Sequence, residues 1–222
     1  MIIIKGLTKR YGEKTVYQGF DLEIKKNSVL AVLGESGSGK TTLLNILAGL
    51  TDYEGEIRNN LTPVSMLFQK DYLVPNLTVY ENLRLVNKEV DIIEALASVG
   101  LEESANAYPK SLSAGMSRRV SILRAFLFDS PMILMDEPTN SLDVGLKRKV
   151  YSILAELKRK YNKTVVAVTH DVDEALSIAD RVIVIDNGKL IYSYNFVSDI
   201  EERDITGNEC NLVRKEIINK LI

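Results

Sequence analysis

Gly34-Glu35-Ser36-Gly37-Ser38-Gly39-Lys40-Thr41-Thr42 is a glycine-rich stretch, and the expected fold of the chain follows from it. A short apolar run, Val29–Leu33, precedes it and predicts a buried strand. Apolar residues recur at helical spacing after it, from Leu43 to Leu50. Glycines let backbone N–H groups converge on one point without a Cβ in the way, and a helix start adds the positive end of its dipole. The order of strand, glycine-rich loop and helix therefore predicts a phosphate-binding loop.

The same stretch fits the pattern G-x-x-x-x-G-K-[ST]. In this pattern Lys40 reaches the outer phosphates, and the Thr41 hydroxyl binds Mg²⁺. The alternative is a glycine turn that merely ends a strand, but the flanking strand and helix favour the phosphate loop. We assign all nine residues to nucleotide binding: Gly34, Glu35, Ser36, Gly37, Ser38, Gly39, Lys40, Thr41 and Thr42.

Size and composition limit the classes of protein. The 222 residues, 45% hydrophobic and 26% charged, are enough for one large α/β domain or two small lobes. The net charge of −2 gives no basic footprint, so we expect no nucleic-acid partner. No run approaches the roughly 18 continuous apolar residues of a membrane span, and Met1–Lys5 is too short for a signal-peptide core. We expect a cytoplasmic protein.

The single cysteine, Cys210, cannot form an internal disulfide, and no Cys/His cluster suggests zinc. We expect this thiol to be structural.

The remaining pattern predicts an α/β fold with a mainly parallel sheet. Residues 1–33 favour β structure, and because Phe20–Ile24 alternates apolar with charged residues, one face of this sheet is expected to be wet. Strand signals vanish between residues 70 and 129, where helices are expected over 78–86, 90–99 and 113–128. Thr78 and Glu81 have the spacing of a capping box, which supports the first of these helices.

Polar residues follow three expected strands at their carboxyl ends, where ligands bind in open α/β sheets. Asp136 and Glu137 follow Met132–Met135. One carboxylate suits Mg²⁺ through water, and the other, which points elsewhere because strand side chains alternate, can orient an attacking water. Gln69 ends the strand 64–68 and could approach the metal or a water, although such a residue is usually a surface loop residue. His170 ends the strand 164–169 and can donate to a phosphate, although a lone histidine is usually structural.

The C-terminal part predicts a helix over 147–160 and a hairpin of strands 181–186 and 189–192 across Asn187-Gly188. The final segment carries an apolar stripe suited to a docking helix, formed by Leu212, Ile217, Ile218 and Leu221.

Several motifs in register resemble the ATP-binding subunit of an ABC transporter. They are Gly34–Thr42, Gln69, Leu112–Met116, Ile133–Glu137, Ser141-Leu142-Asp143 and His170. The resemblance implies a phosphate-loop NTPase with an N-terminal antiparallel β subdomain and an inserted helical subdomain. It implies one ABC ATPase domain over 1–222, with a core of 1–69 and 130–194, a helical subdomain of 70–129 and a tail of 195–222.

The resemblance also implies roles for particular residues within one subunit. Tyr11 would stack on adenine, whereas the residues alone favour a core position for it. Thr41, Gln69 and Asp136 would bind the metal. Glu137 would be the catalytic carboxylate, helped by Lys40, Gln69 and His170. Of these, His170 would be the switch histidine that contacts the γ-phosphate. The loop of Gln69 would touch the membrane partner.

Other implied roles reach across a dimer. Ser113 and Gly115 would cap the ATP bound to the opposite subunit, with a helix N-terminus aimed at its γ-phosphate. Asp143 would communicate between the two subunits. Leu112–Met116 departs from the family signature L-S-G-G-Q at Ala114 and Met116, and methionine cannot donate a hydrogen bond.

The stretch Gln69–Asn82 and Met116 are similar to the ATPases of nitrate, sulfonate and taurine importers. The segment 55–69 is short for the family, so we expect a trimmed antiparallel β region. The resemblance implies an ATP- and Mg²⁺-dependent ATPase that drives transport by separate transmembrane permease subunits, on the inner face of the membrane. Its partners would be a second copy or a paralogue and a solute-binding protein.

Three alternatives are weighed against this function. A soluble phosphate-loop kinase or GTPase would share the loop, but Asn162–Val165 lacks the guanine-reading aspartate. A non-transport ABC ATPase, such as an iron–sulfur assembly protein, has a compatible length. A degenerate ATP-binding module would explain Ala114 and Met116, but the intact Lys40 and Glu137 oppose it.

Overall fold

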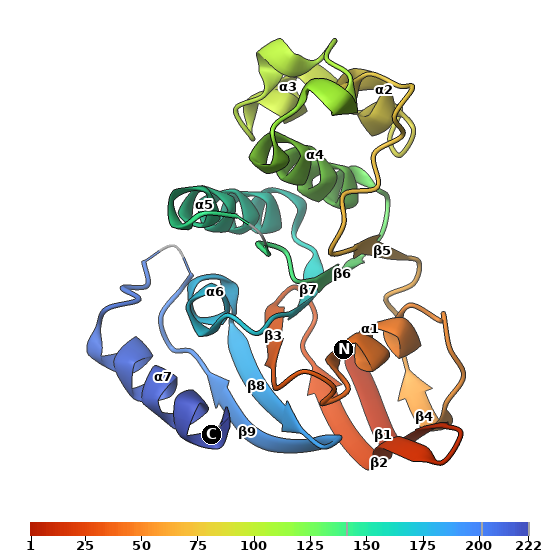
Figure 1. Ribbon diagram of the computed structural model, residues 1–222, viewed down its shortest axis with the longest axis vertical. Coiled ribbons are helices and arrows are strands. Elements are labelled where there is room, and N and C mark those ends of the chain that lie inside the picture. Colours follow the sequence, from red (N-terminus) through yellow and green to blue (C-terminus); the bar gives the residue numbers. More distant parts are fainter. Residues whose placement is uncertain (141, 201, 222) are drawn as a thin grey trace.

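The computed structural model describes residues 1–140, 142–200 and 202–221. Within them the chain forms two sheets, one of three strands in the order β2-β1-β4 and one of six in the order β5-β6-β7-β3-β8-β9 (Figure 1). The mainly parallel sheet of an α/β fold is therefore confirmed, and an antiparallel sheet at the N-terminus lies beside it.

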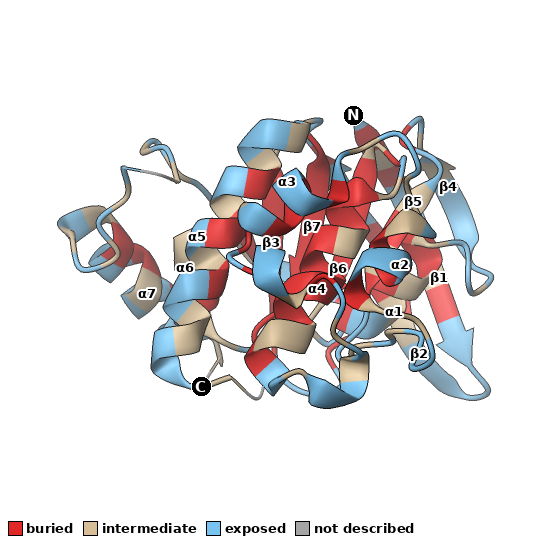
Figure 2. Cartoon of the chain, turned by 90° about the horizontal axis from the view of Figure 1, so that it is seen from above, coloured by how far each residue is buried: buried red, intermediate tan, exposed pale blue. Residues whose placement is uncertain are grey.

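The central strands form because most of their residues are apolar. β3 (Val29–Leu33) pairs in parallel with β7 (Thr164–Val168) and with β8 (Arg181–Asp186). β6 (Met132–Asp136) pairs in parallel with β7 and with β5 (Val64–Leu67). Such strands are buried on both faces, as continuous apolar runs predict. Figure 2 shows this burial in red, with exposed residues toward the outside.

The antiparallel pairs follow their turn signals. β8 and β9 (Lys189–Asn195) form the expected hairpin, and both Asn187 and Gly188 have a positive φ, as that turn requires. β1 (Ile2–Tyr11) and β2 (Lys14–Ile24) form a second hairpin, and β4 (Glu54–Arg58) pairs with β1. The alternation in Phe20–Ile24 is observed, since one face of β2 is buried there and the other is exposed.

The two faces of the six-stranded sheet bury separate apolar clusters. Leu30 and Val32 pack with α1 (Lys40–Leu47) and the three-stranded sheet. Ala31 and Leu33 face the other cluster, which holds the remaining helices. Because neighbouring residues of β3 point to opposite faces, this strand is the centre of both cores.

The segment between β5 and β6 is helical, as expected. It contains α2 (Val79–Arg84), α3 (Ile92–Ala97), α4 (Ala114–Leu127) and two short 3₁₀ turns, Glu102–Ser104 and Pro109–Ser111. The capping box is present, with the Thr78 side chain accepting from the Glu81 backbone and Glu81 accepting from Thr78. These helices pack over one end of the sheet in Figure 1. The division into subdomains at residues 69, 129 and 194 remains a prediction.

The first of two C-terminal helices starts earlier than expected. α5 (Val144–Tyr161) begins three residues before Lys147, because the Asp143 side chain caps it by accepting from the Leu146 N–H. α7 (Asn208–Leu221) buries Cys210, Val213 and Ile217. The expected stripe is thus partly wrong, since Leu212 is 67% exposed and Ile218 is 41% exposed. The buried Cys210 is consistent with a structural thiol.

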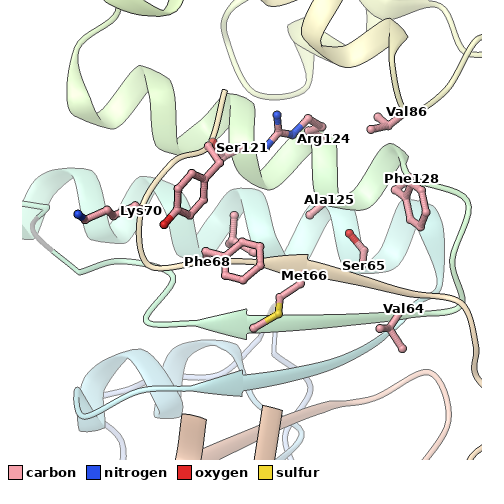
Figure 3. A pocket seen from close by; sticks show the side chains of 12 residues that line it. Val64, Ser65, Met66, Phe68, Lys70, Val86, Ser121, Arg124, Ala125 and Phe128 are labelled. Carbon is pink, nitrogen blue, oxygen red and sulfur yellow. The ribbon is translucent and has the colours of Figure 1, made fainter. Parts of the chain in front are cut away.

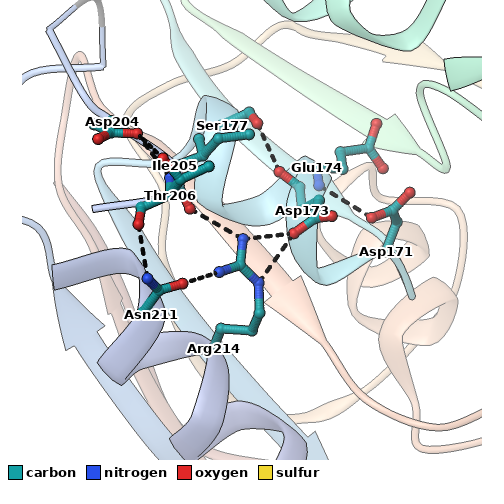
Figure 4. Close-up of polar contacts among 9 residues, drawn as sticks. All are labelled: Asp171, Asp173, Glu174, Ser177, Asp204, Ile205, Thr206, Asn211 and Arg214. Atoms are coloured by element: carbon teal, nitrogen blue, oxygen red, sulfur yellow. Dashed lines mark hydrogen bonds and ion pairs between the residues drawn. The ribbon is translucent and has the colours of Figure 1, made fainter. Parts of the chain in front are cut away.

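The tail is attached to the rest of the chain by polar contacts. The Arg214 guanidinium donates to one carboxylate oxygen of Asp173 in α6 (Val172–Ile178), at 2.8 and 3.1 Å (Figure 4). The buried part of Arg203 donates to the carbonyls of Leu176 and Ala179, and its guanidinium lies 3.8 Å from the centre of the Phe196 ring. Among the helices described, none is long and apolar enough to cross a membrane.

Candidate functional site

The phosphate loop connects β3 to α1, and two of its glycines are required by close contacts. A Cβ on Gly34 would lie 2.2 Å from the carbonyl oxygen of Ile185. A Cβ on Gly39, which caps α1 with φ at 109°, would lie 2.9 Å from the ring of Tyr17. Larger residues cannot occupy these positions without moving the loop.

Tyr17 supports this loop and was missed by sequence reasoning. Its hydroxyl donates to the carbonyl of Gly39 at 2.9 Å, and only 1% of the residue is exposed. Burial raises the pKa of this phenol far above its usual value. The alternation of Phe20, Leu22 and Ile24, extended backwards, would place Tyr17 on the exposed face, but the β1–β2 pairing shifts register before Tyr17 and the residue is buried.

Lys40 is directed into the loop. Its ammonium donates to the carbonyls of Gly34 and Glu35, both at 2.8 Å, and the residue is 9% exposed. Burial lowers the pKa of Lys40, while the nearby charges of Glu137 and Asp136 act in the opposite direction. Of the polar side-chain atoms described, the Ser38 hydroxyl in the same loop is buried without a hydrogen-bond partner. A phosphate chain in this loop would provide acceptors for both groups.

Thr41 and Asp136 meet beside the loop. Burial, followed by the charge of Glu137, raises the pKa of Asp136, and the nearby Thr41 side chain acts in the opposite direction. A hydroxyl and a carboxylate are oxygen ligands of the kind that Mg²⁺ prefers. No cluster of three or more His, Cys, Asp or Glu residues is found in the described part of the chain. This donor set fits Mg²⁺ that is bound mainly through nucleotide phosphates and water.

Glu137 and His170 form a second pair at the same edge. The Nδ1 atom of His170 lies 2.6 Å from Oε2 of Glu137, and the histidine side chain is 64% exposed. Glu137 differs from Asp136 in direction for a reason that the sequence did not show. β6 ends at Asp136, and Glu137 has a left-handed backbone with φ at 51°, so the chain turns there instead of continuing the strand alternation.

Tyr11 borders the other side of the loop. It is 49% exposed, so the core position favoured by the residues alone is wrong. The ammonium of Lys9 lies 4.6 Å from the centre of its ring. A hollow of about 230 Å³ is lined by Tyr11, Lys14, Val16 and loop residues from Gly37 to Thr42. An aromatic face and the phosphate loop therefore border one hollow, which suits an adenine base and its phosphates.

Gln69 lies two residues beyond the end of β5 and is exposed. Its neighbour Phe68 is tied through its carbonyl to the Arg118 guanidinium at 2.7 Å. Arg118 is a further residue that sequence reasoning missed.

Ser113, Gly115 and Asp143 lie apart from the phosphate loop in a single chain. Ser113 is exposed and caps α4, accepting from the Met116 N–H at 3.3 Å. Asp143 is exposed at the start of α5, and Gly115 faces the Leu146 side chain there. Figure 1 places α4 and α1 on either side of β6. The Met116 side chain packs against the core, which agrees with its inability to act as a donor. Ser141 lies outside the described residues.

The fold and this loop define an α/β protein of the phosphate-loop class. The sequence pattern of the family described as "ABC transporter" matches residues 17–140, more than half of the chain. The chain therefore belongs to the ABC transporter family. It is an ATP-binding subunit of that family, and its activity is ATP hydrolysis. This assignment excludes the soluble kinase or GTPase.

Two curated relatives illustrate the similarity. The aliphatic sulfonates import ATP-binding protein SsuB 2 of Paraburkholderia xenovorans is 39% identical over 199 residues, which cover 87% of this chain and 80% of the relative. A protein of the same description from Rhodococcus jostii is 41% identical over 195 residues, which cover 85% of this chain and 80% of that relative.

A solved structure shows the same fold. The dimeric ATP-binding cassette MJ0796, in a post-hydrolysis state bound to ADP and Pi, is 31% identical, with a TM-score of 0.74. The match covers 90% of this chain and all of that one.

Proposed function

We propose that this chain is the ATPase of an importer for aliphatic sulfonates or similar small organic anions. The proposal of ATP hydrolysis rests on one structural observation. Five candidate residues lie close together at one edge of the sheet: Lys40, Thr41, Asp136, Glu137 and His170. The substrate class rests on the sulfonate-import relatives, whose names describe importers. These names also favour transport over the iron–sulfur assembly alternative.

Two copies, or this chain and a paralogue, would enclose two ATP molecules. In each site one subunit supplies Tyr11 for the adenine, Gly34–Thr42 for the phosphates and Glu137 to orient water. The other subunit supplies Ser113 and Gly115, while Asp143 lies at the contact between the two. The separation of α4 from α1 in one chain supports this arrangement, because one subunit cannot supply both halves of a site.

Magnesium would be held by Thr41 and, through water, by Asp136 and Gln69. The ion would neutralise charge on the transferred phosphate, as in other phosphate-loop ATPases. His170 would hold Glu137 in place and donate to the γ-phosphate. Catalysis at such a site comes mainly from positioning and from stabilisation of charge.

A groove beside Gln69 is the candidate docking site for the permease. It has a volume of about 270 Å³ and lies between β5 and α4. Figure 3 shows Phe68 and Met66 on one wall and Arg124 and Ala125 on the other, with Lys70 at one end. Phe68 is 42% exposed and Tyr72 is 61% exposed, and their rings meet edge to face at 5.5 Å. Exposed aromatic residues around a concave surface are typical of an interface. Docking there would place this subunit on the inner face of the membrane.

Reconstitution of the assembled transporter in vesicles tests this function. The chain would be copurified with its permease subunits and supplied with a solute-binding protein and ethanesulfonate. We expect release of free phosphate that increases with ethanesulfonate, and accumulation of ethanesulfonate in the vesicles. Hydrolysis that ignores every sulfonate but increases with another solute would contradict the substrate class. Copurification with a soluble scaffold and no permease would contradict transport.

A further inference from the structure

One buried cation connects two chain segments beside the candidate site. Arg118 lies in the helix that follows Ser113, and only 3% of it is exposed. Its Nε donates to the Pro138 carbonyl at 2.5 Å, and its Nη2 donates to the Glu137 carbonyl at 2.9 Å. Its Nη1 donates to the Phe68 carbonyl at 2.7 Å and to the Asp71 carboxylate at 3.0 Å.

Burial of a guanidinium costs desolvation free energy, so the hydrogen bonds that offset this cost must all be kept. A buried guanidinium is tolerated only when it is paired and its donors are satisfied. Asp71 supplies the opposite charge, and three main-chain carbonyls accept the remaining bonds. The planar group of arginine can serve several acceptors at fixed angles, whereas lysine provides only a point charge.

The acceptors belong to two segments with different tasks. Phe68 and Asp71 lie on either side of Gln69 in the chain, and Phe68 lines the groove proposed for the permease. The other two carbonyls belong to Glu137 and Pro138, where the backbone leaves β6 in a left-handed conformation. A shift of the first segment therefore moves the guanidinium and, through it, the backbone that directs the Glu137 side chain.

The neighbouring arginine shows that this arrangement is specific to Arg118. Arg119 is also buried, but it donates to the carbonyls of Val99, Gly100 and Gly115, all in the helical region. Within the described residues, these hydrogen bonds of Arg119 reach neither of the segments that Arg118 joins.

We infer that Arg118 is a positioning residue that links the Gln69 loop to the backbone of Glu137, and so couples permease contact to the rate of ATP cleavage. This inference rests on the proposed roles of Glu137 as the catalytic carboxylate and of the Gln69 loop as permease contact. Among the described residues, the hydrogen bonds of Arg118 go to Phe68, Asp71, Glu137 and Pro138 and not to the phosphate loop.

The test compares Arg118→Lys and Arg118→Gln with the wild type in the assembled transporter. The matched control is Arg203→Gln, which removes a half-buried guanidinium in the tail that also donates to main-chain carbonyls. Each protein is measured for kcat, for the KM of ATP, for melting temperature, and for the ratio of hydrolysis rates with and without the loaded binding protein.

We expect both Arg118 variants to lose about 10- to 100-fold in kcat, with the KM of ATP changed by less than about twofold, since misplacement of a catalytic group costs rate more than binding. The stimulation ratio should fall toward one. Arg203→Gln should lose stability but keep kcat and the ratio. If Arg118→Gln does not fold, the test rests on Arg118→Lys, which keeps the positive charge but loses the planar group that serves several acceptors.

The inference is overturned if folded Arg118→Lys keeps kcat and the stimulation ratio within about twofold of the wild type. It is also overturned if the Arg203 control loses rate to the same extent. Failure of the proposed function has a different signature, because then the wild type itself shows no stimulation by a permease. Even without stimulation by a permease, a fall in kcat with an unchanged KM of ATP in the Arg118 variants would still test the contact with the Glu137 backbone.

Discussion

The imidazole of His170 and the carboxylate of Glu137 lie 2.6 Å apart, although β6 and β7 bring them from positions 33 residues apart in the chain. The two strands are paired, so polar residues that follow both of them meet at the same edge. Glu137 is shielded from solvent and His170 is largely exposed. The exposed histidine is therefore accessible to a ligand, whereas the carboxylate is mostly covered.

Glu137→Gln should bind Mg·ATP as the wild type does but hydrolyse it at least about 100-fold more slowly, because the amide cannot accept a proton. The stalled variant should form an ATP-dependent dimer, detectable by light scattering. His170→Ala should lower kcat about 10- to 100-fold with a small change in KM. The exposed Glu103→Gln is the control and should leave turnover unchanged. Unaltered turnover of Glu137→Gln would remove this residue from its role.

Tyr11→Ala should weaken ATP binding about 10-fold, since stacking of an aromatic ring on a base contributes about 1–3 kcal/mol. Tyr11→Phe keeps the ring and should bind ATP nearly as well as the wild type. Inorganic triphosphate has no base, and its affinity should be equal in all three proteins. Calorimetric titration measures each affinity, and an equal loss of triphosphate binding in Tyr11→Ala would refute base stacking.

Arg203→Ala should lower the free energy of unfolding by about 2–4 kcal/mol, because two carbonyls of the α6 region lose a charged donor and the Phe196 ring loses its cation. Urea denaturation measures this change. The ATPase rate of the folded fraction should remain that of the wild type, since the tail lies away from the phosphate loop. No loss of stability would show that the tail is not anchored by this residue.

Glu174 makes stability depend on pH. It is 1% exposed in α6 and accepts from the Thr139 hydroxyl at 2.7 Å, and burial raises its pKa. The unfolded chain loses this proton near the ordinary pKa of 4.5, below the pKa in the folded protein. The folded state then binds more protons, so stability decreases as pH rises above 4.5 until the folded pKa is passed.

Glu174→Gln cannot ionise, so the stability of the wild type relative to this variant should fall between pH 5 and pH 8. Denaturant unfolding at both pH values measures the difference. The exposed Glu216→Gln should show no such dependence. A difference that stays constant with pH would mean that Glu174 does not gain its proton on folding.

The phosphate loop and the central strands were predictable because each depends on local sequence. Val29–Leu33 and Met132–Met135 are apolar throughout, and only a doubly covered strand suits such runs. The position of His170 was also predictable, because ligands bind at the carboxyl ends of strands in open α/β sheets and His170 follows such a strand. The start of α5 was missed because it depends on the cap at Asp143, and the buried face of α7 includes Cys210 and Val213, which were not in the predicted stripe.

Other features depend on tertiary contacts and could not be predicted. A charged residue within a helix is ordinarily exposed, so nothing in the pattern around Arg118 indicated that it would be 3% exposed. The positive φ of Glu137 is likewise unusual for a residue that is not glycine. Tyr17 and Gly39 are 22 residues apart, and their contact arises only when β2 lies against the phosphate loop.

The distance between α1 and α4 in one chain also has a genetic consequence. Suppose a cell carries two alleles, one with Lys40→Ala and one with Ser113→Arg. In a mixed pair of their products both lesions fall on the same ATP, and the second ATP meets only unaltered residues. Either allele alone should abolish growth on a sulfonate as sulfur source, whereas the two together should partly restore it.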